Sequence, residues 1–208
     1  MPQEWEEHEI KELMEKYTAV TIPVKVSLDA QQQVLDTGSV EKMLSTTEMI
    51  SLMDCYCRKK LKNCDKPLEV CIGLNKEAEY FIEKEGAKEI SLEDALNVLK
   101  RSHKAGLVHL AYYRKGENCD IICSCCSCCC HHLSGLKRFG FNEAVVKSDF
   151  VAVFEKSVCS DCGVCVERCQ FGAWEFDEGG VVFDVDHCFG CGLCVSSCPA
   201  GAVSLVKR

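Results

Sequence analysis

Eight cysteines near the C-terminus form two runs with the same spacing, and this duplication constrains the fold more than any other feature of the chain. Each run has the pattern Cys-x2-Cys-x2-Cys-x3-Cys. The members are Cys159, Cys162, Cys165 and Cys169 in the first run, and Cys188, Cys191, Cys194 and Cys198 in the second. Gly163 and Gly192 repeat at the same offset of 29 residues. A repeated unit of this length predicts two equivalent halves packed against each other.

Short apolar stretches flank the cysteine runs. Residues 151–154 and 181–185 have the pattern of short strands, and residues 177–180 are a turn signal between two of them. Cys165 and Cys169 lie four residues apart, which places them on one face of a helix. The sequence therefore predicts a βαββαβ unit, and we expect residues 146–208 to form a domain of their own.

The spacing of each run is typical of thiolates that surround an iron–sulfur cubane. Three cysteines of a run bind one cluster, and the fourth, one helical turn further on, binds the other. The first predicted cluster takes Cys159, Cys162, Cys165 and Cys198; the second takes Cys188, Cys191, Cys194 and Cys169. Two zinc ribbons are the alternative, but such sites use separate Cys-x2-Cys pairs.

On these motifs, residues 150–208 resemble a bacterial-type ferredoxin with two [4Fe–4S] clusters. The resemblance implies transfer of single electrons at low potential. One position departs from the family pattern, because Gln170 stands where a proline normally follows the fourth cysteine, as Pro199 does in the second run. This departure concerns the local geometry of the second cluster and does not remove a ligand.

The other eleven of the 19 cysteines have no internal symmetry. They are Cys55, Cys57, Cys64, Cys71, Cys119, Cys123, Cys125, Cys126, Cys128, Cys129 and Cys130. We expect at least one further iron–sulfur cluster here, with candidate ligands Cys55, Cys57, Cys64, Cys71, Cys123, Cys125 and Cys126. Two cubanes, one larger non-cubane cluster, zinc and no metal remain alternatives. His131 and His132 are expected at the surface or beside the ligands, because so many thiolates compete for a metal.

Residues 1–145 are predicted to form a mainly helical, cysteine-rich domain with one β-hairpin, which makes the whole chain α+β. Amphipathic spacing predicts a helix over residues 4–17, Ser39 is a candidate cap for a helix reaching Leu52, and Ser91 with Asp94 caps another. Residues 107–113 and 119–123 suggest the hairpin. The cysteine pattern of this region also resembles that of ferredoxin-like proteins of anaerobes.

Composition restricts the compartment and the partners. The N-terminus has no secretory signal pattern, so we expect a reducing, cytoplasmic setting in which cysteines bind metal rather than form disulfides. No apolar run approaches the roughly 18 residues of a membrane span. The formal net charge of −8 argues against nucleic acid as the main partner.

These observations predict an iron–sulfur protein that relays single electrons between redox partners, as a subunit or module of an anaerobic, hetero-oligomeric complex. No nucleotide-binding fingerprint or catalytic triad is present, so an electron carrier is favoured over a stand-alone enzyme. One alternative is a reductase whose N-terminal cysteines hold a substrate-binding cluster, possibly of a non-cubane type. A second alternative is a redox sensor.

Overall fold

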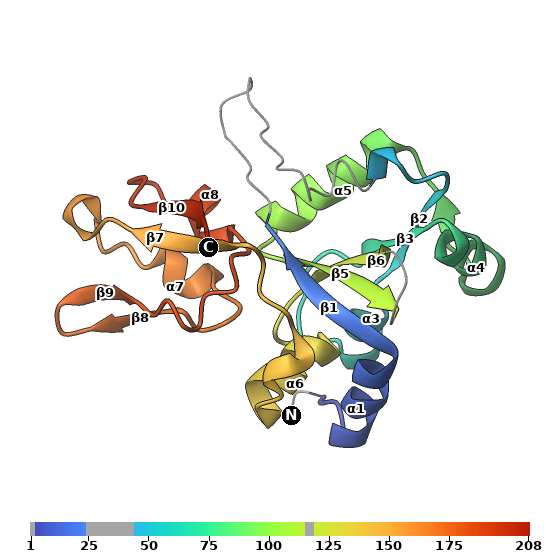
Figure 1. Ribbon diagram of the computed structural model, residues 1–208, viewed down its shortest axis with the longest axis horizontal. Coiled ribbons are helices and arrows are strands. Elements are labelled where there is room, and N and C mark those ends of the chain that lie inside the picture. Colours follow the sequence, from blue (N-terminus) through green and yellow to red (C-terminus); the bar gives the residue numbers. More distant parts are fainter. Residues whose placement is uncertain (1–2, 24–43, 115–118) are drawn as a thin grey trace.

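The computed structural model describes residues 3–23, 44–114 and 119–208 (Figure 1). Helices and strands are mixed along the described residues, in agreement with the α+β prediction. Within these ranges, no helix combines the length and the apolar character that crossing a bilayer requires.

The N-terminal part is built on a six-stranded antiparallel sheet. Its order is β1-β5-β6-β3-β2-β4. The strands are β1 (Tyr17–Ile22), β2 (Ile50–Asp54), β3 (Glu69–Leu74), β4 (Lys88–Glu89), β5 (Val108–Arg114) and β6 (Cys119–Cys125). The expected hairpin is present as β5 and β6, which occupy the middle of the sheet (Figure 1).

Among the elements whose full extent lies in the described residues, five α-helices and one 3-10 turn accompany this sheet. They are α1 (Glu7–Lys16), α3 (Tyr56–Leu61), α4 (Lys76–Glu85), α5 (Leu92–Lys104), α6 (His131–Phe139) and the 3-10 turn η1 (Asn142–Ala144). The predicted cap of α5 is confirmed, because the Asp94 backbone N–H donates to Ser91 Oγ at 3.1 Å and Asp94 in turn accepts from the Ser91 backbone. Helix α1 packs against α6 at one end of the sheet (Figure 1).

The N-terminal region contains more β-structure than the single hairpin that the sequence predicts, because the hairpin is part of a six-stranded sheet. The helix expected to reach Leu52 is replaced at its end by β2, in which Ile50 pairs with Leu74 of β3; residues 39–43 lie outside the described residues. Strand β3 is a continuous apolar run, buried from Val70 to Leu74. A strand that is buried on both faces lacks the alternation of apolar and polar residues by which strands are recognised. The sequence pattern therefore predicts fewer strands than the sheet contains.

The C-terminal part contains two small antiparallel sheets. Its elements are β7 (Phe150–Phe154), the 3-10 turn η2 (Lys156–Val158), α7 (Val164–Arg168), β8 (Trp174–Asp177), β9 (Gly180–Phe183), α8 (Leu193–Ser197) and β10 (Val203–Lys207). Strand β7 pairs with β10, and β8 pairs with β9. Gly163 and Gly192, at φ 75° and 78°, begin the two short helices in the same left-handed conformation. The sequence repeat is therefore also a repeat of local backbone structure.

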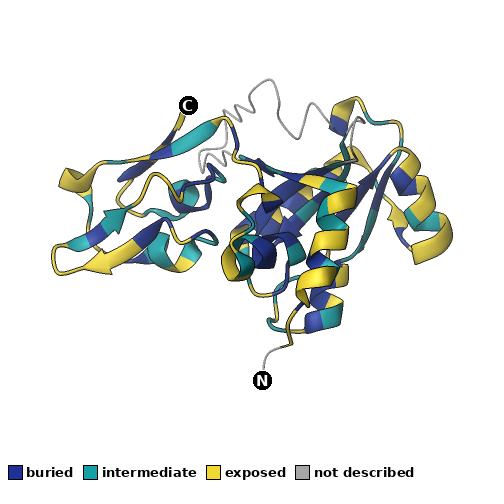
Figure 2. Cartoon of the chain, turned by 60° about the horizontal axis from the view of Figure 1, so that its bottom comes forward, coloured by how far each residue is buried: buried dark blue, intermediate teal, exposed yellow. Residues whose placement is uncertain are grey.

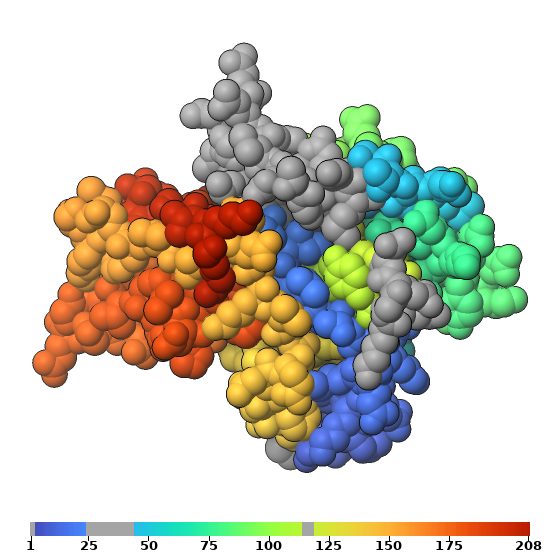
Figure 3. Space-filling view, in the orientation of Figure 1, coloured from blue at the N-terminus to red at the C-terminus, as the bar shows by residue number. Residues whose placement is uncertain are grey.

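The two parts of the chain meet over a buried contact. Figure 2 shows most of the buried residues in the central sheet, while the outer ends of the C-terminal strands are exposed. Arg168 donates to the backbone carbonyl oxygens of His103 and Lys104 at 2.9 and 2.8 Å, and His103 Nε2 lies 2.5 Å from Ser196 Oγ. In the space-filling view the C-terminal residues, orange to red, lie directly against the N-terminal part (Figure 3).

Candidate metal centres

Four cysteines from distant positions of the C-terminal part surround one small cavity. They are Cys159, Cys162, Cys165 and Cys198, the set predicted for the first cluster. Gly163 and Val164 of the cysteine loop line the same cavity, together with Phe154 of β7 and Val181 of β9. The cavity thus has sulfur atoms from both repeats and an apolar wall, as a cluster site requires.

The set predicted for the second cluster is also brought together. Burial raises the pKa of the Cys191 thiol to about 12, and negative charge on the nearby Cys169 and Cys188 contributes to the increase. Burial and the same neighbours raise the pKa of Cys194. Such closely spaced buried thiols stay protonated at neutral pH unless a cation stabilises the thiolates, which is the chemistry of a metal site.

Backbone N–H groups point at the sulfur atoms of both sets. The N–H of Ala173 lies 3.4 Å from Cys169 Sγ, and the N–H of Ala202 lies 3.2 Å from Cys198 Sγ. These are equivalent positions of the repeat. Hydrogen bonds of this kind to cysteine sulfur stabilise negative charge and set the potential of an iron–sulfur cluster.

The comparison with protein families agrees with this geometry, because residues 158–202 match the model of the 4Fe-4S dicluster domain. Residues 158–202 are a dicluster ferredoxin segment. A search of curated proteins found no match to the chain. The two sets of four cysteines supply the number of thiolates that the two cubanes of such a domain need.

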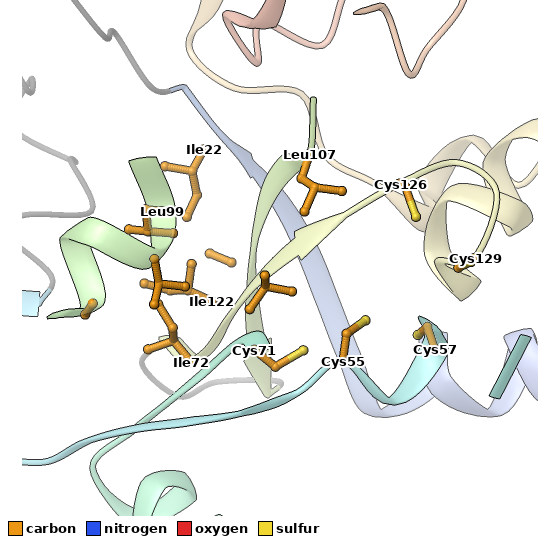
Figure 4. Close-up of a cluster of buried hydrophobic side chains, with 14 of the residues drawn as sticks. Ile22, Cys55, Cys57, Cys71, Ile72, Leu99, Leu107, Ile122, Cys126 and Cys129 are labelled. Carbon is orange, nitrogen blue, oxygen red and sulfur yellow. The ribbon is translucent and has the colours of Figure 1, made fainter. Parts of the chain in front are cut away.

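Outside the dicluster domain, eight of the remaining eleven cysteines gather around a second and larger cavity. Its volume is about 350 Å³, and eight cysteines line it: Cys55, Cys57, Cys71, Cys123, Cys125, Cys126, Cys129 and Cys130. They come from the start of α3, from β3 and β6, and from the loop between β6 and α6. Figure 4 shows Cys55, Cys57 and Cys71 near the loop that carries Cys126 and Cys129, at one end of the aliphatic core.

The sheet register explains why cysteines far apart in the sequence meet here. Cys71 of β3 lies opposite Cys123 of β6, and their Sγ atoms are 3.7 Å apart. Cys125, two residues further along β6, lies on the same face of the strand as Cys123. The hydroxyl of Tyr112 on β5 lies 4.0 Å from Cys125 Sγ and 3.7 Å from Cys130 Sγ. Neighbouring strands thus place several thiols and a phenol along one wall.

A buried arginine lies beside these thiols. Arg58 is 1% exposed; its guanidinium donates to the carbonyl oxygen of Ser124 at 2.6 Å and to that of Pro67. Burial opposes the charge of Arg58, but negative charge on Cys55 and Cys126 more than compensates, and the pKa of the guanidinium is raised. A buried positive charge of this kind offsets the negative charge of thiolate ligands.

The candidate set predicted from the sequence is divided by the structure. Six of its seven members line the large cavity, namely Cys55, Cys57, Cys71, Cys123, Cys125 and Cys126. Cys64 instead lies with Cys126, Cys128 and Cys129. The prediction also missed Cys129 and Cys130, which line the cavity. Only the adjacency of these two residues to Cys126 in the sequence could have suggested them.

The two histidines after the cysteine run differ in exposure, because His132 is buried and His131 is half-buried. His132 is fully buried, and burial lowers the pKa of its imidazole to about 4. His131 lines the large cavity, and its Nδ1 lies 3.0 Å from Cys57 Sγ. The expectation that they lie beside the cysteines therefore describes His131, whereas a surface position is wrong for His132.

Proposed function

We propose that the chain is an iron–sulfur electron-transfer protein in which the dicluster domain exchanges electrons with a third cluster in the large cavity. The proposal assigns the first cluster to Cys159, Cys162, Cys165 and Cys198, and the second to Cys188, Cys191, Cys194 and Cys169. It also assigns residues 146–208 to a βαββαβ ferredoxin domain and residues 1–145 to a separate domain that holds the third cluster.

The packing between the second cluster set and the cavity carries this proposal. Cys169 and Cys191 pack against the same buried cluster that contains Cys125 and Cys130 of the cavity wall. Phe171 and Phe189 also belong to this cluster, with their rings stacked 4.3 Å apart. A shared apolar cluster that lies between two groups of cysteines suits electron transfer from one metal cluster to another.

The first cluster set has the opposite environment. Cys162 is exposed, and Cys159 is partly exposed beside the side chain of Asp161. In this arrangement an external partner meets the first cluster, and electrons pass through the second cluster to or from the cavity. We expect the partner to be another redox protein, in an anaerobic complex of the reducing cytoplasm.

The first experiment counts iron and acid-labile sulfide in the full chain after anaerobic purification. Two [4Fe–4S] clusters alone give about eight iron atoms per chain, and a third cubane raises this to about twelve. A content of eight, with no additional signal in electron paramagnetic resonance (EPR) spectra of the reduced protein, would overturn the third cluster.

The second experiment tests whether electrons reach the third cluster through the second cluster. Cys191→Ser removes a ligand of the second cluster, and Cys119→Ser is the matched control, because the Cys119 thiol contacts the Ile121 carbonyl and lines neither cavity. Each variant is mixed with a reduced bacterial ferredoxin as donor. Reduction of the third cluster slows in Cys191→Ser and not in the control; equal rates would show that electrons enter the cavity directly.

A reductase is the second candidate, and the large cavity favours it. Eight cysteines exceed the four that a cubane binds, and the cavity extends to Tyr56 and Tyr80, which are 62% and 50% exposed. A cluster with an open coordination site would respond to cyanide as a probe ligand with a changed EPR signal. A cluster whose iron atoms all carry thiolates would not respond.

A further inference from the structure

Four cysteines at the edge of the large cavity form a compact group. Their sulfur atoms lie closer together than those of either cluster set of the dicluster domain. The sulfur atoms of Cys64, Cys126, Cys128 and Cys129 all lie within 4.8 Å of one another. Cys64 Sγ and Cys126 Sγ are 3.9 Å apart. Cys64 follows the end of α3, and the other three belong to the loop between β6 and α6.

The size of this group matches one metal ion. Four thiolates at about 2.3 Å from a single tetrahedral metal lie about 3.8 Å from one another. In a cubane each thiolate is bound to a different iron atom, so the four sulfur atoms lie farther apart. The spacing of the group therefore fits a mononuclear centre and is too tight for a cluster.

The loop that carries three of the thiols is held by groups outside it. Trp5 Nε1 donates to the carbonyl oxygen of Cys129 at 2.8 Å, and Asn63 Nδ2 donates to that of Cys128 at 2.8 Å. Within the loop, the Cys130 N–H donates to the Cys126 carbonyl oxygen at 3.0 Å. The positions of the thiols are thus set by the backbone and its partners.

Backbone N–H groups also reach the sulfur atoms. The backbone of Lys66 hydrogen-bonds to the Cys64 thiol, and the backbone of Asn63 hydrogen-bonds to the Cys129 thiol. Hydrogen bonds of this kind stabilise thiolate charge around a metal and orient the ligands.

We propose that Cys64, Cys126, Cys128 and Cys129 hold a single tetrahedral metal ion, Zn²⁺ or mononuclear Fe²⁺, separate from every iron–sulfur cluster. Four thiolates close the coordination sphere, as in structural sites, and tetrahedral four-sulfur ligation selects these two metals. The assignment leaves six cysteines for the cavity: Cys55, Cys57, Cys71, Cys123, Cys125 and Cys130.

The test measures zinc, iron and acid-labile sulfide in the anaerobically purified full chain. Cubanes contain equal numbers of iron and sulfide, so the proposed ion is counted apart from them. The expected result is about one zinc per chain, or about one iron in excess of sulfide, and either result identifies the metal. Zinc near zero together with equal iron and sulfide would overturn the proposal.

Two variants and a control locate the ion. Cys64→Ser and Cys128→Ser are expected to lose the single metal while the sulfide content stays unchanged, and Cys119→Ser is expected to keep both. A loss of one cluster's share of sulfide in Cys64→Ser would instead make Cys64 a cluster ligand and overturn the site. Failure of the third cluster lowers iron and sulfide equally and leaves the zinc count and the excess of iron over sulfide unchanged, so the two proposals are tested independently.

X-ray absorption at the zinc or iron edge of the unaltered protein gives a test that does not depend on folding of the variants. For zinc, the expected first shell is four sulfur atoms at about 2.3 Å. If the ion is iron, its absorption overlaps with that of the cluster iron atoms. In that case the ratio of iron to sulfide tests the site. A zinc shell with nitrogen or oxygen ligands would contradict the tetrathiolate site.

Discussion

Gln170 Oε1 accepts a hydrogen bond from the backbone N–H of Ser127 at 2.9 Å. Gln170 directly follows Cys169 of the second cluster set, and Ser127 lies between Cys126 and Cys128 of the proposed mononuclear site. The Gln170 amide also donates to the Gly106 carbonyl oxygen at 3.2 Å. The residue that replaces the usual proline thus connects the dicluster domain to the cysteine loop.

The Gln170 contact predicts a measurable loss on Gln170→Ala. Two hydrogen bonds at about 1 kcal/mol each should lower the free energy of unfolding by about 2 kcal/mol. The Ser127 amide should also exchange with deuterium faster. Ser127→Ala is the control, because it retains the backbone N–H, and unchanged exchange at Ser127 in Gln170→Ala would disprove this role.

Arg58 predicts a shift in the potential of the proposed third cluster. Arg58→Met removes a buried positive charge. The loss of this charge disfavours the reduced cluster, which is the more negative state, so the midpoint potential should fall. Loss of the hydrogen bonds of Arg58 should also lower the free energy of unfolding by about 2 kcal/mol.

The measurement for Arg58 is a redox titration followed by EPR, with the two clusters of the dicluster domain as internal references. Arg58→Lys is the matched variant, because it keeps the charge and loses the planar guanidinium. If Lys shifted the potential as far as Met does, the effect would come from hydrogen bonding and not from charge.

The C-terminal site could be predicted from the sequence because its constraints are local. Within each run the spacing alone places three thiols on one short loop, and the repeat indicates where the fourth comes from. Gly163 and Gly192 begin their helices with nearly equal φ, as the repeat predicts. The role of Gln170 could not be predicted, since its partner lies 43 residues earlier in the chain.

The N-terminal site could not be predicted in the same way, because strand register creates it. Cys71 and Cys123 are 52 residues apart and meet through the pairing of β3 with β6. Hydrophobic periodicity carries no information about which strands pair or in which register. The division of the eleven cysteines into a cavity set and a tight group of four therefore required the structure.

His103 predicts that acid weakens the contact between the two parts of the chain. Burial, with a smaller effect of Arg168, lowers the pKa of His103 to about 4, below the usual value of about 6.5. The unfolded chain therefore binds more protons between these values, and stability is lost as the pH falls through this window. Between pH 7 and pH 5 the loss from this group is about 2 kcal/mol.

Denaturant unfolding of the full chain at several pH values measures this loss. His103→Gln cannot take up the proton, so its stability should change less over the same pH range, even though its stability at pH 7 is lower. An equal slope in both proteins would assign the acid sensitivity to other groups.

Adding a single methyl group at Gly190 is expected to cause a severe defect in the second cluster. Gly190 has φ 70°, and a Cβ there would lie 2.1 Å from the backbone oxygen of Phe150 and 2.3 Å from Ser148 Oγ. Gly190→Ala should therefore displace the loop between Cys188 and Cys191, with loss of about four iron atoms per chain. Gly172→Ala is the matched control, because Gly172 has φ 78° and open space, so only about 1 kcal/mol of backbone strain is expected. Equal iron contents in the two variants would show that the clash at Phe150 does not control the second cluster.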